Sequence, residues 1–151
     1  MHELDNLFQY IKGRVWEKRG VDTYDFYPGN TKGGQAYNRA AFIFVLEMIL
    51  HKYRMEHATI FEPLEGRKAL HHMIFTKTNW KLEYIRTLSL ADCLFVIHDE
   101  LKISKLPEDA KSYISGLNIP ENTLTFDEVK DEEWDAMGNF AYLQTLKMNN
   151  N

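Results

Sequence analysis

Apolar residues recur every three or four positions along most of the chain, which is the spacing that places them on one face of an α-helix. The first predicted helix covers residues 3–18 and stops at Gly20. The longest covers residues 35–57, and because its segment 40–50 is apolar nearly all round, we expect it to lie at the centre of the fold. Four side chains of that segment are expected to be almost wholly buried: Phe42, Val45, Leu46 and Ile49.

Turn-forming and capping residues divide the rest of the chain into shorter helices. Pro63 and Gly66 interrupt the chain before a short helix that is predicted over about residues 67–75. Asn79 is the expected N-terminal cap of the next short helix. The apolar residues of that helix are Trp80, Leu82 and Ile85.

Start signals predict three more helices. Ser89 with Asp92, and Thr125 with Glu128, have the spacing of a capping box, in which two residues satisfy free N–H groups at a helix N-terminus. Pro107 suits the first turn of a helix, so a helix is expected there as well. The last of the three is expected to run almost to the end of the chain. The helix after Ser89 carries an apolar stripe of Leu90, Leu94, Ile97 and Leu101.

These elements predict an all-α fold. We expect a single domain over residues 1–151, built as a packed bundle of six or seven helices, with a disordered polar tail at residues 148–151. A length of 151 residues fits one domain, and a composition with 44% hydrophobic and 13% aromatic residues supplies a core. No run approaches ~18 apolar residues, so no contact with a membrane is predicted.

The N-terminus and the cysteine content favour the cytoplasm. Residues 1–18 are charged throughout and lack the apolar region of a signal peptide. Cys93 is the single cysteine of the chain, so no internal disulfide is possible. Because it lies among apolar neighbours, we expect it to be a small buried side chain.

Residues 21–34, with the sequence VDTYDFYPGNTKGG, are predicted to form a long loop because they are rich in Gly, Asp and Asn and contain a Pro-Gly pair. Carboxylates and aromatic rings on such a loop suit recognition of a partner. The alternative is that the rings form a lid over one end of the bundle. The loop residues that we consider for partner binding are Asp22, Tyr24, Asp25 and Tyr27.

Acidic residues are concentrated near the C-terminus. Seven carboxylates and one lysine give residues 121–135 a net charge of −6, whereas the whole chain carries −4. The overall acidity argues against direct nucleic-acid binding, which normally needs a basic surface. The residues of this acidic cluster that we consider for partner binding are Asp127, Glu128, Asp131, Glu132, Glu133, Trp134 and Asp135.

Two interpretations of the acidic cluster remain open. Carboxylates interact favourably with the dipole at a helix N-terminus, so the cluster can be a solvated helix start with Trp134 packed inward. Alternatively, it is a docking surface for a basic partner, because complementary charge speeds association and discriminates between partners. Trp134 would then be an anchor, since Trp is typical of the few residues that dominate binding energy.

The sequence indicates no cofactor, no metal site and no catalytic residue. None of the six histidines is paired with another at the i, i+4 spacing of metal ligands. The adjacent His71 and His72 would point about 100° apart on a helix, which prevents them from sharing a metal easily. No phosphate-binding loop or dinucleotide fingerprint is present. We therefore expect a protein that is not an enzyme.

The segment 71–101 resembles a known family. Its order HH-x-I-F followed by W-x-L-x-x-I-R-x-L-S-L-x-D is similar to a stretch in small helical immunity proteins of bacterial contact-dependent growth inhibition systems. The resemblance covers about a fifth of the chain. It implies a cytoplasmic protein that binds one cognate toxin domain and blocks its active site. Many such toxins are basic nucleases, for which an acidic surface would stand in for substrate phosphates.

A second resemblance supplies an alternative function. Arg67 and His72 have the Arg-x4-His spacing of the all-helical HEPN ribonucleases, in which an Arg and a His from two subunits meet at the scissile phosphate. Two features depart from that family: Lys68 at the second position of the motif, and the central place of the motif in the chain. A third possibility is a phage or plasmid accessory protein that binds another partner.

Overall fold

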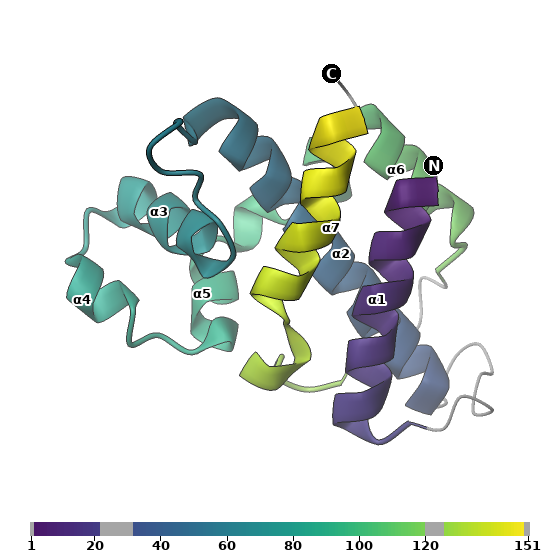
Figure 1. Ribbon diagram of the computed structural model, residues 1–151. Helices are drawn as coiled ribbons and strands as arrows, with labels where there is room; N and C mark the ends of the chain where they lie inside the picture. Colours follow the sequence, from purple (N-terminus) through teal and green to yellow (C-terminus); the bar gives the residue numbers. More distant parts are fainter. Residues whose placement is uncertain (1, 22–31, 120–125, 150–151) are drawn as a thin grey trace.

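The computed structural model describes residues 2–21, 32–119 and 126–149. Within these ranges the chain forms seven α-helices, three short turns of 3₁₀-helix and no β-strand, so the predicted all-α bundle is confirmed (Figure 1). Three long helices form its body: α1 is His2–Arg19, α2 is Lys32–His57 and α7 is Ala136–Asn149. None of the helices in the described ranges has the length and hydrophobicity that a membrane span requires.

Helices α1 and α7 lie side by side and antiparallel, and α2 crosses behind both (Figure 1). Helix α1 ends where Gly20 adopts a φ of +63°, a left-handed conformation that glycine tolerates without strain. Phe8 of α1 meets Phe44 of α2 edge to face, with ring centroids 6.1 Å apart. The apolar face of α1 is buried throughout: Leu4, Leu7, Phe8, Ile11 and Val15.

Four shorter helices surround this body. Their bounds are Arg67–Thr78 for α3, Leu82–Ile85 for α4, Leu90–Val96 for α5 and Glu108–Gly116 for α6. The 3₁₀ turns are η1 at His98–Glu100, η2 at Ile103–Lys105 and η3 at Asp131–Glu133. Helices α3, α4 and α5 lie together on one side, and α6 lies beside the start of α1, where Tyr113 donates a hydrogen bond of 2.7 Å to Asp5 (Figure 1).

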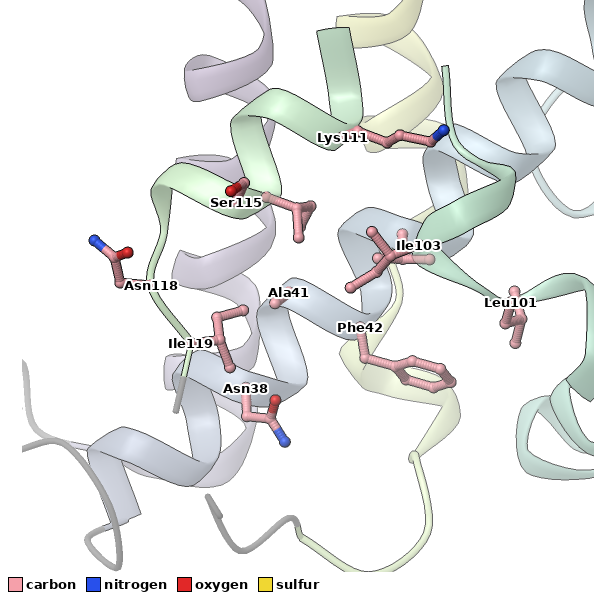
Figure 2. Close-up of a pocket in the computed structure, with 11 residues that line it drawn as sticks. Asn38, Ala41, Phe42, Leu101, Ile103, Lys111, Ser115, Asn118 and Ile119 are labelled. Atoms are coloured by element: carbon pink, nitrogen blue, oxygen red, sulfur yellow. The ribbon is translucent and has the colours of Figure 1, made fainter. Parts of the chain in front are cut away.

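The middle of α2 forms the core, as its sequence predicts. Leu46 is fully buried, and Val45 and Ile49 are 6% and 5% exposed. Phe42 differs from the prediction, because its side chain is only half-buried and lines a hollow. The reason is that α6 and the chain joining α5 to α6 leave a gap over this part of α2 (Figure 2).

One predicted helix cap is confirmed and one is wrong. Ser89 caps α5, because its side-chain oxygen accepts a hydrogen bond of 3.1 Å from the backbone N–H of Asp92. Asn79, the predicted start of a helix, instead ends α3, with a φ of 61° and its N–H bonded to the carbonyl of Phe75. Asn is among the few residues that adopt this left-handed conformation readily, which suits it to a helix C-terminus.

The C-terminal region differs from its predicted helix. Residues 126–130 are not helical, η3 covers the next three residues, and α7 begins only at Ala136. Thr125, the expected cap, lies outside the described residues. We refer to residues 126–135 as the strap. At its other end α7 continues to Asn149, into the segment that the sequence predicts to be a disordered tail.

Two arginines explain why the start of the strap is not helical. Arg39 of α2 donates hydrogen bonds to the carbonyls of Phe126, at 3.1 Å, and Asp127, at 2.7 Å. Arg19 of α1 donates to the carbonyl of Glu128 at 2.9 Å. Side chains thus satisfy the carbonyls that would otherwise accept the N–H groups of a following helical turn. The strap is therefore fastened across α1 and α2 in a non-helical form.

Candidate functional site

Two residues of the acidic cluster lie inside the protein. Glu133 is 1% exposed and forms ion pairs with Arg19 and, at 2.8 Å, with Arg39. Trp134 is 4% exposed, and its Nε1 donates a hydrogen bond of 2.8 Å to Oε2 of the buried Glu47. Neither side chain presents a surface to a partner. Both anchor the strap to the helices beneath it.

Two further acids of the strap are exposed but engaged within the chain. Asp127 forms an ion pair with Arg19 at 3.5 Å. Asp131 forms an ion pair with Arg67 at 3.4 Å and accepts a hydrogen bond of 3.1 Å from the backbone N–H of Leu90. These contacts tie the strap to α1, to α3 and to the start of α5.

The other three acids of the strap differ in their surroundings. Asp135 is half-buried and accepts hydrogen bonds from the Tyr10 hydroxyl and, at 3.2 Å, from the N–H of Gly138. The bond from Tyr10 lowers the pKa of Asp135. Glu128 and Glu132 are exposed, and their carboxylates form no hydrogen bond or ion pair with another described residue. Of the seven predicted binding residues in the strap, these two are therefore the exposed carboxylates that no described contact within the chain engages.

The loop residues predicted for partner binding are outside the described ranges. These residues are Asp22, Tyr24, Asp25 and Tyr27.

A hollow of about 660 Å³ opens between α2, α6 and the chain that joins α5 to α6. Its lining is largely apolar, with Phe42 and Val45 from α2, Ile114 from α6, and Leu101 and Ile103 from the joining chain. Figure 2 shows residues of all three segments around this space: Asn38, Ala41, Phe42, Leu101, Ile103, Lys111 and Ser115.

Two smaller hollows continue from the first. One of about 310 Å³ shares Phe42 and Leu101 with it. A third, of about 390 Å³, shares Ala91, Glu128 and Val129 with the second. We refer to the three hollows together as the groove. The groove runs from α6, past α5, to the strap.

The groove changes from apolar to acidic along its length. The charged residues that line the second and third hollows are one lysine, Lys130, and five acids: Asp92, Asp127, Glu128, Asp131 and Glu132. His98 also lines the second hollow. Among these acids Asp92, Glu128 and Glu132 are exposed and form no ion pair with another described residue. These three unpaired carboxylates outnumber Lys130, the one lysine that lines this part of the groove, so the strap end has a negative potential.

Sequence reasoning missed the apolar part of the groove. Phe95 is 81% exposed and Ile103 is 52% exposed, although both are large apolar residues. A signal was available, because Phe95 falls outside the apolar stripe of its helix and Ile103 stands between Lys102 and Ser104. Single exposed apolar residues are common on protein surfaces, however, and only their convergence on one groove gives them a meaning.

Arg67 and His72, the pair of the ribonuclease alternative, have different neighbours although both lie on α3. Arg67 pairs with Asp131, and its guanidinium lies 5.0 Å from the ring centre of Trp134. His72 shares a hydrogen bond of 2.6 Å between its Nδ1 and the hydroxyl of Tyr53. Each of the two side chains is therefore engaged in its own contact within the chain.

A network of polar side chains is buried between α2, α7 and the loop before α3. Burial raises the pKa of Glu47 to about 7, although the bond from Trp134 and the charge of Arg54 oppose the rise. Arg54 donates hydrogen bonds to the carbonyls of Leu64, at 2.7 Å, and Gly66, at 2.8 Å. Glu47 is fully enclosed, so this network acts on the stability of the fold.

The described residues offer little for covalent or metal chemistry. Cys93 is buried, and burial raises the pKa of its thiol to about 11, so the thiolate is scarce at neutral pH. Within the described ranges, no group of three or more His, Cys, Asp or Glu side chains is arranged to hold a metal ion. The groove is thus the feature that offers the clearest means of binding another molecule.

Comparisons with protein-family models, with curated proteins and with solved structures find no match for this chain. Its function is therefore inferred from the groove and from the sequence resemblance.

Proposed function

We propose that this chain is an immunity protein, which binds a cognate bacterial toxin domain in the cytoplasm and blocks its active site. The single observation that carries the proposal is the groove, with an apolar hollow of about 660 Å³ at one end and an excess of carboxylates over lysines at the other. Apolar contacts at the centre of an interface supply affinity, and charge at its edge selects the partner. The groove combines both on one surface.

The acidic end supports a nuclease as the toxin. A nuclease holds the phosphates of its substrate with lysine and arginine, so its active site is basic. Exposed carboxylates such as those of Glu128 and Glu132 suit such a site, because they offer negative charge in place of phosphate. We propose no catalytic step for the chain itself, since Cys93 is buried and Arg67 and His72 do not line the groove.

Protection of growth tests the proposal. The toxin domain encoded beside the gene for this chain is expected to stop the growth of cells that express it alone. Co-expression of this chain should restore growth, and co-expression of an unrelated helical protein should not. Equal arrest with and without this chain would show that the proposed function is wrong.

The ribonuclease alternative has its own test. The purified chain should leave tRNA, mRNA and DNA intact, with or without divalent metal ions, if it is an immunity protein. Cleavage that is lost in both Arg67→Ala and His72→Ala would replace the proposal with a HEPN-like ribonuclease, in which two chains would have to contribute to one site.

A further inference from the structure

We infer that the groove receives a cationic amphipathic segment of its partner. Such a segment presents an apolar side chain to the hollow beside Phe42 and lysine or arginine side chains to the strap end. The inference rests on the proposed function for the identity of the partner as a toxin, and on the lining of the groove for the chemistry of the bound segment.

The apolar end of the groove supplies an anchoring site. Its volume of about 660 Å³ lies within the ~300–1,000 Å³ typical of ligand-binding pockets. Phe42 and Ile103 line it while remaining partly in water, and Phe95 stands exposed at the adjoining hollow. Covering these side chains with an apolar group of a partner removes their surface from water, which is the main favourable contribution to protein association.

The acidic end determines the sign of the partner's charge. The fold itself uses the carboxylates of Asp127 and Asp131, which pair with arginines on α1 and α3. It leaves Asp92, Glu128 and Glu132 without an ion pair to any described residue. These three carboxylates attract a cationic segment and repel nucleic acids, phosphorylated peptides and anionic lipid surfaces.

The order of the hollows determines the arrangement of the bound segment. Phe42 and Leu101 border both the first and the second hollow, and Glu128 and Val129 border both the second and the third. The apolar anchor and the basic residues must therefore be neighbours on the partner. A purely apolar segment would leave the acidic end unused, and a polycation would leave the first hollow filled with water.

Selection from a displayed peptide library tests this inference and does not require that the toxin be identified. Random peptides of about 16 residues, long enough for an amphipathic segment, are selected on the wild-type chain and counter-selected on a Phe95→Ser/Ile103→Ser variant. The enriched peptides should combine apolar residues with a net positive charge. A synthetic copy should bind about tenfold more tightly at about 50 mM salt than at about 300 mM, because salt screens the attraction.

Charge reversal at the groove has a matched control. Glu128→Lys/Glu132→Lys should weaken binding of the selected peptide about tenfold. Glu56→Lys/Glu83→Lys, which makes the same change of net charge at exposed positions outside the groove, should bind it as the wild type does. Ile60→Ser/Phe61→Ser provides the apolar control, since both side chains are more than nine-tenths exposed but do not line the groove.

Several results would overturn the inference. The selection would contradict it if the enriched peptides were acidic or neutral, or if no peptide preferred the wild type to the counter-selected variant. Equal binding of the selected peptide by the wild type and by Glu128→Lys/Glu132→Lys would contradict it as well. A wild-type dimer that Phe95→Ser/Ile103→Ser dissociates would make a second copy of this chain the occupant, which also contradicts it. Growth protection that survives the Glu128→Lys/Glu132→Lys reversal would contradict this inference alone. Binding of cationic peptides without growth protection would contradict only the proposed function.

Discussion

Glu133 is the residue at which arginines from two helices converge. Its carboxylate is buried between Arg19 of α1 and Arg39 of α2, and it also accepts a hydrogen bond of 2.8 Å from the N–H of Lys130. Burial of a charge costs several kcal/mol unless partners of good geometry compensate it. The strap thus depends on polar contacts in the interior, and its conformation is sensitive to single substitutions there.

Arg39→Ala should lower the free energy of unfolding by about 3 kcal/mol or more, because it removes one partner of a buried carboxylate and the donor to three strap carbonyls. Arg14→Ala is the matched control. Arg14 donates to the carbonyl of Glu132 from an exposed position, so its loss should cost about 1 kcal/mol or less. Urea denaturation measures both values. Equal losses for the two variants would mean that the buried arginine does not hold the strap.

Glu47 should make the protein less stable as the pH rises. Its pKa is raised by burial from 4.5 to about 7 in the folded chain. Below pH 4.5 the residue is protonated in both states. Between 4.5 and 7 the unfolded chain loses the proton first, so the free energy of unfolding falls with pH, by on the order of 3 kcal/mol in total. Above pH 7 the residue is ionised in both states, so it causes no further change in the free energy of unfolding.

Glu47→Gln tests that dependence, because the neutral amide keeps an oxygen that can accept the hydrogen bond from Trp134. Urea melts of the two proteins give the free energy of unfolding across the same pH window. That free energy should fall more steeply with pH for the wild type than for the variant. Parallel curves would mean that Glu47 remains ionised throughout and that its burial is compensated by Arg54.

At the scale of elements, hydrophobic spacing predicts most of the helices. It identifies α2 as the central helix, because few of its positions between 40 and 50 are polar. A second signal, Ser89, marks the start of α5, because its hydroxyl satisfies a free N–H group there. Such signals are local. The strap could not be predicted in this way, because its form depends on Arg19 and Arg39, which are distant in sequence from the carbonyls that they bind.

The candidate site is less predictable than the fold. Negative charge near the C-terminus is visible in the sequence, and Glu128 and Glu132 do line the groove. The sequence does not distinguish them from Glu133, which follows the exposed Glu132 directly in the chain yet is buried. The apolar half of the groove arises where α2 is left partly uncovered, and the positions of Phe95 and Ile103 in the sequence do not show that they converge there with Phe42.

Two residues of α2 should respond differently to truncation. Leu46 is fully buried, so Leu46→Ala should cost about 2–5 kcal/mol of stability through lost contacts and the cavity that remains. Phe42 is half-buried and lines the groove, so Phe42→Ala should cost less than the ~3–5 kcal/mol of a fully buried phenylalanine. Denaturant melts compare the two variants. A loss below about 1 kcal/mol for Leu46→Ala would contradict the position of the core.

At the scale of the whole molecule, the strap has two sides with different roles. Its inner side, with Glu133 and Trp134, fastens it to α1 and α2, and its outer side, with Glu128 and Glu132, forms one wall of the groove. The same segment thus stabilises the fold and supplies exposed carboxylates to the groove. Substitutions on the outer side should therefore change binding with little effect on stability.

The rate of association with the toxin domain tests the central claim most directly. Stopped-flow mixing of the toxin domain with the wild-type chain and with Glu128→Lys/Glu132→Lys gives that rate at low and high salt. Electrostatic attraction toward the acidic end of the groove predicts association about tenfold slower for the variant, with a weaker salt dependence and an unchanged melting temperature. Equal association rates and equal salt dependence for the two proteins would contradict the account, because the toxin would then bind without using the groove's acidic end.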